Sequence, residues 1–200
     1  GTFIIPDTVT SVGEQAIRHC TEITEVIISD SIKEFKPGSF MDCTSLKKVV
    51  FPDTVTKLGS AAFMNCESLE YVDFGKGLKT LPAACCSKCP NLTTAVIGDK
   101  ISTLYLVPFL ECPSLKDIYF TGDEGAWDKL LHTVSPLDTV IKNATVHFGH
   151  PDDMQFDGYG SGLVNVGGSS DSNDDSSVDY SDATEDSQRS SFALIIVLCC

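Results

Sequence analysis

Cysteine is the residue type through which this chain could do chemistry, because nine of its 200 residues are cysteines. The segment Cys86-Ser87-Lys88-Cys89 has the C-x-x-C spacing of zinc and disulfide-exchange sites, and Cys85 places a third sulfur beside it. Cysteines also recur every 23 residues, at Cys20, Cys43, Cys66, Cys89 and Cys112. One such period before Cys86 stands Phe63, so both ends of the C-x-x-C motif fall on positions of a repeat. The repeat explains the motif, and we predict neither a metal nor a redox centre.

Seven of the cysteines lie in residues 1–150, and an odd number cannot pair completely. A cysteine inside a turn packs well as a small apolar side chain, so we predict buried thiols. Neighbouring units of a repeat would lie about 5 Å apart, which leaves a strained disulfide between them as the alternative.

The other residue types give no catalytic pattern. The four histidines, His19, His132, His147 and His150, show no metal-ligand spacing beyond His147-x-x-His150. There is no zinc-protease helix motif, nucleophile elbow or phosphate-binding glycine loop. A net charge of −14 without a basic stripe argues against nucleic acid as a partner. We therefore expect a monomeric, non-enzymatic protein without a cofactor.

The 23-residue period extends to the apolar residues, which indicates a solenoid of stacked units. Two of the recurring apolar positions comprise Val9, Ile32, Val55, Leu78 and Ile101, and Val12, Phe35, Leu58, Leu81 and Leu104. Two more comprise Ile23, Leu46, Leu69, Leu92 and Leu115, and Ile28, Phe51, Phe74, Ile97 and Phe120.

A single unit shows how the chain is expected to run. Residues 46–51 have the L-x-x-L-x-L spacing of a leucine-rich-repeat strand, in which Val49 and Phe51 point inward by alternation. Residues 52–54 form a turn, because Pro52 fixes φ and lacks an N–H donor. The chain then returns two apolar side chains from the opposite wall, and residues 59–66 are predicted to form a short helical or 3-10 turn.

The sequence of residues 51–69, FPDTVTKLGSAAFMNCESL, resembles the BspA-like class of leucine-rich repeats, and the resemblance covers roughly residues 1–148. It implies an α/β fold: a right-handed leucine-rich-repeat solenoid with a parallel sheet on the concave face and short helical or 3-10 turns on the convex side. The fourth unit departs from the pattern with Cys85 and Cys86 in its Ala-Phe positions, and the fifth has Pro108 for alanine. BspA-like proteins occur on the surfaces of host-associated bacteria and mucosal protozoa, so the resemblance also implies adhesion.

The predicted repeat region spans residues 1–120 and contains a half repeat followed by five full repeats. Phe3 and Ile5 stand 23 residues before Val26 and Ile28, so residues 2–5 read as the strand of a unit cut in half. The chain is therefore interpreted as a fragment of a longer protein. A complete protein with a degenerate first strand is the alternative.

Residues 121–150 are predicted to form a C-terminal capping helix and strand. Thr121-Gly122-Asp123-Glu124 reads as a capping box, and apolar residues at helical spacing follow it. Among them, Trp127 is expected to act as a lid on the last coil rather than to stack on a ligand. Residues 141–148 alternate like a closing edge strand.

The remaining residues differ in composition. Residues 151–191 hold ten acidic residues and one arginine with many serines and glycines, which predicts a disordered acidic stalk. Residues 192–200 are all apolar, whereas a membrane-spanning helix needs about 20 residues. We interpret them as the start of a transmembrane segment. A short glycolipid-anchor signal and a fortuitous apolar end are the alternatives, and Cys199 and Cys200 could be acylated.

Ligand binding is predicted on the concave face of the sheet, where strand residues point outward. The candidate residues are Ile27, Lys48, Val50, Tyr71, Asp73, Val96 and Tyr119. Four of them, Ile27, Val50, Val96 and Tyr119, form what we call the apolar ridge. The ridge is either a recognition patch or a consequence of strand propensity. Two sequons make Asn91 and Asn143 candidate N-glycosylation sites.

The sequence thus favours a protein-binding or adhesion module, displayed on a cell surface as a membrane-anchored ectodomain. Its partner would be a protein or a cell-surface or matrix ligand. An intracellular leucine-rich-repeat scaffold is one alternative, and the repeat part of a larger enzyme or toxin is another.

Overall fold

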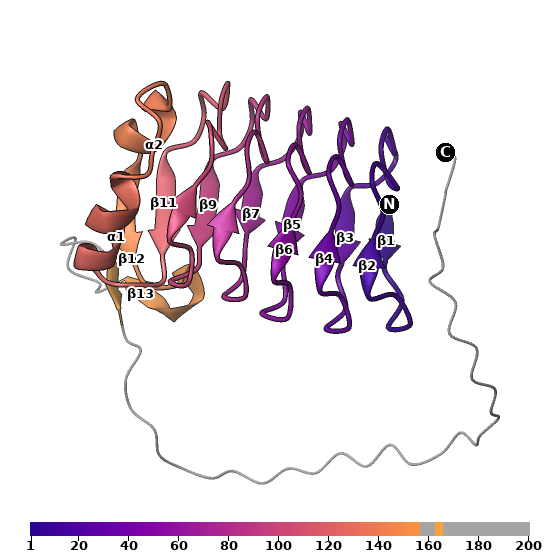
Figure 1. Ribbon diagram of the computed structural model, residues 1–200, viewed down its shortest axis with the longest axis horizontal. Helices are drawn as coiled ribbons and strands as arrows, with labels where there is room; N and C mark the ends of the chain where they lie inside the picture. Colours follow the sequence, from indigo (N-terminus) through magenta and orange to yellow (C-terminus); the bar gives the residue numbers. More distant parts are fainter. Residues whose placement is uncertain (157–162, 166–200) are drawn as a thin grey trace, which may run out of the picture.

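The computed structural model of the chain describes residues 1–156 and 163–165, and residues 1–148 form a solenoid (Figure 1). One wall is a seven-stranded parallel sheet in the order β1-β3-β5-β7-β9-β11-β12. Its strands are β1 (Thr2–Ile4), β3 (Glu25–Ile27), β5 (Lys48–Val50), β7 (Tyr71–Asp73), β9 (Thr94–Ile97), β11 (Asp117–Phe120) and β12 (Thr145–Phe148). Tyr71 pairs with Lys48 on one side and with Thr94 on the other, so the 23-residue period is the register of the sheet. The predicted fold class is confirmed.

The core lies between this sheet and the opposite wall, and the repeat fills it with equivalent side chains. Val49 and Phe51 point inward and are buried, as the alternation predicts. The ring of Phe51 stacks on Phe74 of the next unit at a centroid distance of 6.1 Å, and it meets Phe63 of the convex side edge-on at 5.7 Å. Each unit therefore packs against its own far wall and against its neighbour, which makes the array cooperative.

The opposite wall consists of two-residue strands and turns. Three of the short strands pair in parallel, β2 (Ser11–Val12), β4 (Glu34–Phe35) and β6 (Lys57–Leu58), and two more pair separately, β8 (Thr80–Leu81) and β10 (Thr103–Leu104).

The convex segments of residues 1–120 are turns, not the α-helical or 3-10 pieces that we expected. The N–H groups of Phe40 and Asp42 donate to carbonyls of the following unit, at 2.8 and 2.9 Å, instead of to their own turn. Asp42 also has a left-handed φ of 63°, which interrupts a right-handed helix. Hydrogen bonding between units therefore replaces helix formation.

The repeated cysteines lie inside these turns and connect the units. The Sγ atoms of Cys43, Cys66, Cys89 and Cys112 lie within hydrogen-bonding distance of the carbonyl oxygen 26 residues earlier, at 3.0, 3.3, 3.2 and 2.9 Å. All seven cysteines of the described residues are buried thiols, which confirms the prediction made for residues 1–150.

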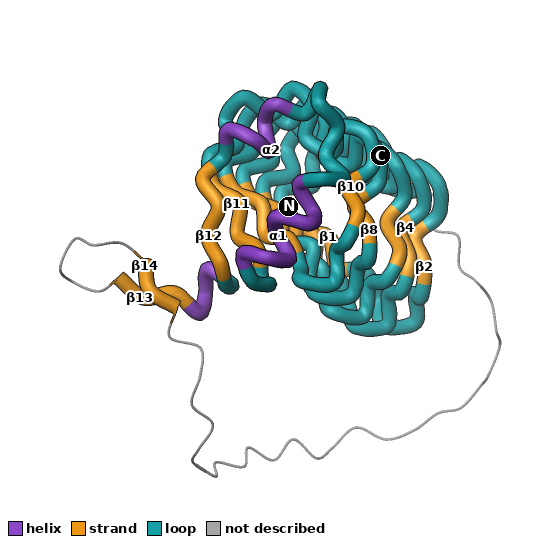
Figure 2. Tube along the Cα trace, turned by 60° about the vertical axis from the view of Figure 1, so that its left-hand side comes forward, coloured by secondary structure: helices purple, strands orange, loops and turns teal. Residues whose placement is uncertain are grey.

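The C-terminal end of the solenoid is closed by two helices and the last strand. Helix α1 (Glu124–Leu131) lies across the end of the tube between β12 and β10 (Figure 2), and Trp127 contacts Phe120 at a centroid distance of 5.3 Å. Trp127 is therefore the lid that we predicted. The N-cap of α1 is Asp123, whose side chain accepts the N–H of Ala126, and the capping box that we placed from Thr121 is wrong by two residues.

The closing strand is shorter than predicted. Residues 139–143 form a second helix, α2 (Thr139–Asn143), so Ile141 is a buried helix residue and not a strand residue. Asp138 decides this difference, because its side chain caps the helix by accepting the N–H of Ile141. Strand β12 begins only at Thr145.

Part of the predicted acidic stalk has a defined structure. A 3-10 turn, η1 (Pro151–Asp153), leads into strand β13 (Met154–Phe156), which pairs antiparallel with β14 (Leu163–Asn165). For residues 151–156 and 163–165 the prediction of disorder is therefore wrong. The rest of the stalk and the apolar run at 192–200 lie outside the described residues. Among the helices of the described residues, none has both the length and the hydropathy needed to cross a membrane.

Candidate functional site

The outer face of the seven-stranded sheet is the concave face on which we predicted binding, and its side chains form two columns. The first column contains Thr2, Glu25, Lys48, Tyr71, Thr94, Asp117 and Thr145. The second column contains Ile4, Ile27, Val50, Asp73, Val96, Tyr119 and His147. All seven predicted binding residues belong to these columns, because the sheet brings equivalent positions of successive units together.

The N-terminal half of the outer face is open. Ile27 is 48% exposed and Val50 is 42% exposed, on neighbouring strands. A shallow hollow of about 330 Å³ lies between these strands, with the charged side chains of Glu25 and Lys48 also lining it. An apolar surface with charged groups beside it is available here for contact with a partner.

The C-terminal half of the outer face is covered, and this interrupts the apolar ridge. Val96 is only 1% exposed and Asp73 only 6%, although both stand in the same column as Val50. Tyr71 and Tyr119 are half-buried. Of the four ridge residues, therefore, Ile27 and Val50 are exposed and Val96 is not accessible.

Two histidines, which sequence reasoning did not include in the site, contact residues of this covered half. Nε2 of His147 lies 2.8 Å from Oδ1 of Asp117, and the His147 ring stacks on Tyr119 at a centroid distance of 4.6 Å. Nε2 of His150 lies 2.9 Å from Oδ2 of Asp73. In the sequence, these contacts were signalled only by the spacing His147-x-x-His150 at the end of the last strand.

The partial burial of Tyr71 on the outer face also changes the pKa of its phenol. Burial is the main cause that raises the pKa of the Tyr71 phenol above its ordinary value, and the negative charges of Asp73 and Asp152 add to it. On its other side, Nζ of Lys48 lies 5.1 Å from the centroid of the Tyr71 ring. Tyr71 is therefore a neutral aromatic group at the boundary between the covered and the open halves.

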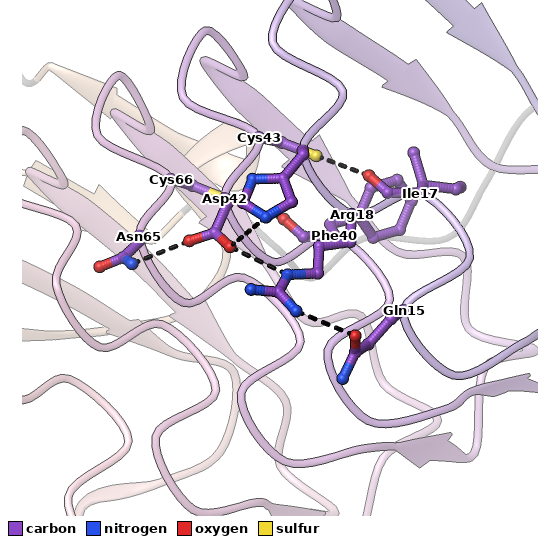
Figure 3. A network of polar contacts seen from close by, with 9 residues as sticks. Gln15, Ile17, Arg18, Phe40, Asp42, Cys43, Asn65 and Cys66 are labelled. Atoms are coloured by element: carbon purple, nitrogen blue, oxygen red, sulfur yellow. Dashed lines mark hydrogen bonds and ion pairs between the residues drawn. The ribbon is translucent and has the colours of Figure 1, made fainter. Parts of the chain in front are cut away.

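A separate polar network lies on the convex side. Asp42 accepts hydrogen bonds from Asn65 Nδ2 at 2.8 Å and from Arg18 Nε at 3.0 Å, and it lies 3.4 Å from His19 Nε2 (Figure 3). Partial burial would raise the pKa of Asp42, but these hydrogen bonds and the nearby His19 and Arg18 charges outweigh it and lower that pKa. The network joins three successive units, and we assign it a structural role.

The remaining candidate groups have simple surroundings. Asn91 and Asn143 are both exposed, and Asn91 Nδ2 donates to the Glu67 carbonyl oxygen at 2.9 Å. Glycosylation of either asparagine stays a prediction. Cys86 and Cys89 of the C-x-x-C motif are fully buried. Within residues 1–156 and 163–165, no group of three or more histidine, cysteine or acidic side chains is arranged to bind a metal ion.

Several solved structures share this fold. The leucine-rich repeat protein of T. pallidum is 21% identical with a TM-score of 0.56, and the match covers 59% of this chain and 57% of that one. A leucine-rich repeat protein from Eubacterium ventriosum is 29% identical with a TM-score of 0.55, covering 58% of this chain and 32% of that one. The pneumococcal vaccine antigen PcpA is 14% identical with a TM-score of 0.57, covering 74% of this chain and 40% of that one. This chain thus spans between 32% and 57% of the length of these proteins.

The search of curated proteins gives no match. The family comparison is specific: residues 1–120 match the BspA type leucine rich repeat region in six copies. The same residues contain six strands of the seven-stranded sheet, from β1 to β11. The chain therefore belongs to the BspA-type leucine-rich repeat family.

Proposed function

We propose that this protein is a non-enzymatic protein-binding module whose contact surface is the open half of the outer sheet face. The observation that carries the proposal is the exposure of Ile27 and Val50, because a sheet face that serves only to cover the core does not need apolar side chains in solvent. Glu25 and Lys48 beside them supply the charged rim that interfaces commonly have. The BspA-type repeat as a module of protein interaction supports the same function.

We extend the proposal to display on a cell surface, where the module would adhere to a protein or matrix ligand. The support is the order of segments: the repeats precede an acidic Ser-, Gly- and Asp-rich stretch, which an apolar run follows at residues 192–200. Such an order suits a domain held away from a membrane. Antibody labelling of intact, non-permeabilised cells tests the display, since labelling only after permeabilisation would favour an intracellular scaffold.

The binding face is tested with paired variants. The immobilised protein is measured against a panel of purified extracellular-matrix proteins and against intact cells, and any interaction found is repeated with Val50→Asp and Ile27→Asp. Both changes are expected to abolish binding, because they place a charge at the centre of an apolar contact. Lys57→Ala, on the exposed convex side, is the matched control and should bind normally. Loss of binding in the control with retention in Val50→Asp would contradict the proposed face.

A further inference from the structure

Asp73 is a recessed carboxylate on an otherwise apolar part of the outer face. It stands in register between Val50 and Val96, at the C-terminal end of β7. Its Oδ1 accepts the backbone N–H of Gly75 at 2.8 Å, which leaves Oδ2 for a partner from outside the strand. Because a buried carboxylate oxygen without a partner is strongly unfavourable, Asp73 needs a donor above the sheet.

His150 supplies this donor. The backbone N–H of Asp152 donates to His150 Nδ1 at 3.2 Å, so the ring carries its proton on Nε2 and donates it to Asp73 Oδ2 at 2.9 Å. Both nitrogens of a neutral imidazole are thereby satisfied. A protonated ring would instead place Nδ1–H beside Asp152 Oδ2, at 3.5 Å. The His150 ring is thus held between Asp73 on one side and Asp152 on the other.

The contact brings together residues that are far apart in the chain and in the sheet. His150 follows β12, whereas Asp73 belongs to β7, and β9 and β11 lie between these strands. The contact therefore spans the two strands β9 and β11, and Val96 of β9 is only 1% exposed. Beside the contact remains a cleft of about 280 Å³, lined by Phe51, Asp53, Asp73, Gly75, Lys76, Thr121, His150 and Asp152.

We infer that Asp73 and this cleft form a subsite for a basic side chain of a protein partner, a lysine, arginine or histidine, and that His150 occupies it as a displaceable internal ligand. The inference rests on the proposed function. Three carboxylates and one lysine line the cleft, so a positively charged side chain is favoured there. A partner that displaces His150 would reach Asp73 directly, and its contact surface would extend from Val50 to the next position of the column.

The segment is attached in a way that permits displacement. Gly149 immediately precedes His150 and has a φ of 118°, a conformation that glycine adopts readily. The Gly149 N–H remains bound to the Phe120 carbonyl at 2.9 Å, so β12 is held while the chain beyond it can turn. The His150 side chain is 21% exposed, and a competing group can therefore approach it from solvent.

The subsite is tested on the full chain with small probes in place of a partner. His150→Gly removes the internal ligand, and imidazole or methylguanidinium is then titrated while the Val96 methyl resonances are followed by NMR. We expect saturable shifts in His150→Gly. The wild type should bind each probe at least about tenfold more weakly, because its own histidine competes at a high effective concentration. Acetate, which has the opposite charge, should cause no saturable shift.

Two further variants separate the subsite from general effects. The double variant His150→Gly with Asp73→Asn should lose probe binding, whereas His132→Ala, on the exposed end of α1, should behave like the wild type. Absence of saturation in His150→Gly would overturn the subsite, and equal binding by the wild type would overturn its occupation by His150. The probe titrations need no protein partner, so they test the subsite alone. The proposed function is tested separately, by partner binding of the Ile27 and Val50 variants.

Discussion

The sulfur of Cys66 lies 3.3 Å from the carbonyl oxygen of Phe40, and the thiol donates its hydrogen to that carbonyl across the boundary between two units. The same relation recurs at Cys43, Cys89 and Cys112. A cysteine at this position is small enough for the turn, apolar enough for the core and able to donate. The repeated cysteines therefore help to hold successive units of the solenoid together.

This relation predicts an order of stability among variants. Cys66→Ala is expected to lower the free energy of unfolding by about 1–2 kcal/mol, because it removes the hydrogen bond and leaves a small cavity. Cys66→Ser keeps a donor and should be less destabilised than Cys66→Ala, as measured by urea unfolding. Cys85 is the matched control: it is equally buried, but its sulfur lies 3.9 Å from the Pro108 carbonyl oxygen, 0.6 Å farther than Cys66 from its carbonyl. If the serine variant is more stable than the alanine variant by the same amount at Cys66 and at Cys85, the hydrogen bond does not cause the difference in stability.

The buried thiols should be unreactive in the folded protein. Burial raises the pKa of the Cys66 thiol well above its ordinary value, so the reactive thiolate is absent near neutral pH. Iodoacetamide in native buffer is therefore expected to leave Cys43 and Cys66 unlabelled, and labelling should become complete after denaturation. Mass spectrometry of the digested protein measures both. Rapid native labelling, or recovery of a Cys43–Cys66 disulfide, would contradict this prediction.

The repeat period predicted what lies inside the solenoid, but not what lies on its outer face. Val49 and Phe51 are inward because alternation in a strand is local, and the period repeats it in every unit. Val50 and Val96 occupy equivalent positions, yet one is open and the other covered. Asp73, the neighbour of both in the column, is bound by His150, which follows the last strand and belongs to no repeat, so periodicity carried no information about this contact.

The cap shows a second limit of sequence reasoning. Ile141 fits the alternation of an edge strand and also the buried face of a short helix, and its apolar character alone cannot distinguish them. The difference lies in Asp138, which accepts the Ile141 N–H and starts α2. A capping interaction of this kind needs only one correctly placed side chain, and it is therefore easily missed beside a stronger hydrophobic pattern.

The core register makes a sharp prediction about two neighbouring positions. Leu69 is fully buried, whereas Glu67 is exposed just after the Cys66 turn. Leu69→Asp is expected to destabilise the array by several kcal/mol, on the order of 3–5, because it buries a charge without a partner. Glu67→Gln should leave the midpoint of thermal unfolding nearly unchanged. Circular dichroism melting curves compare them, and similar midpoints for the two variants would show that the register is wrong.

The convex network around Asp42 predicts how stability depends on pH. Its hydrogen-bonded partners lower the pKa of Asp42 in the folded state, so the unfolded chain takes up this proton first as the pH falls. The contribution of the Asp42 charge to the free energy of unfolding is complete above the pKa of aspartate in the unfolded chain, about 4, and it is lost as the pH falls through the pKa of Asp42 in the folded protein.

The variant Asp42→Asn tests this pH dependence, because it removes the charge but tolerates the left-handed φ of 63° at this position. The thermal midpoint of the wild type should therefore exceed that of Asp42→Asn at neutral pH, and the difference should shrink below about pH 4. The exposed Asp7, changed to asparagine, is the control and should show no such convergence. A difference between wild type and Asp42→Asn that stays constant from neutral pH into this acidic range would mean that the Asp42 charge does not hold the three units together.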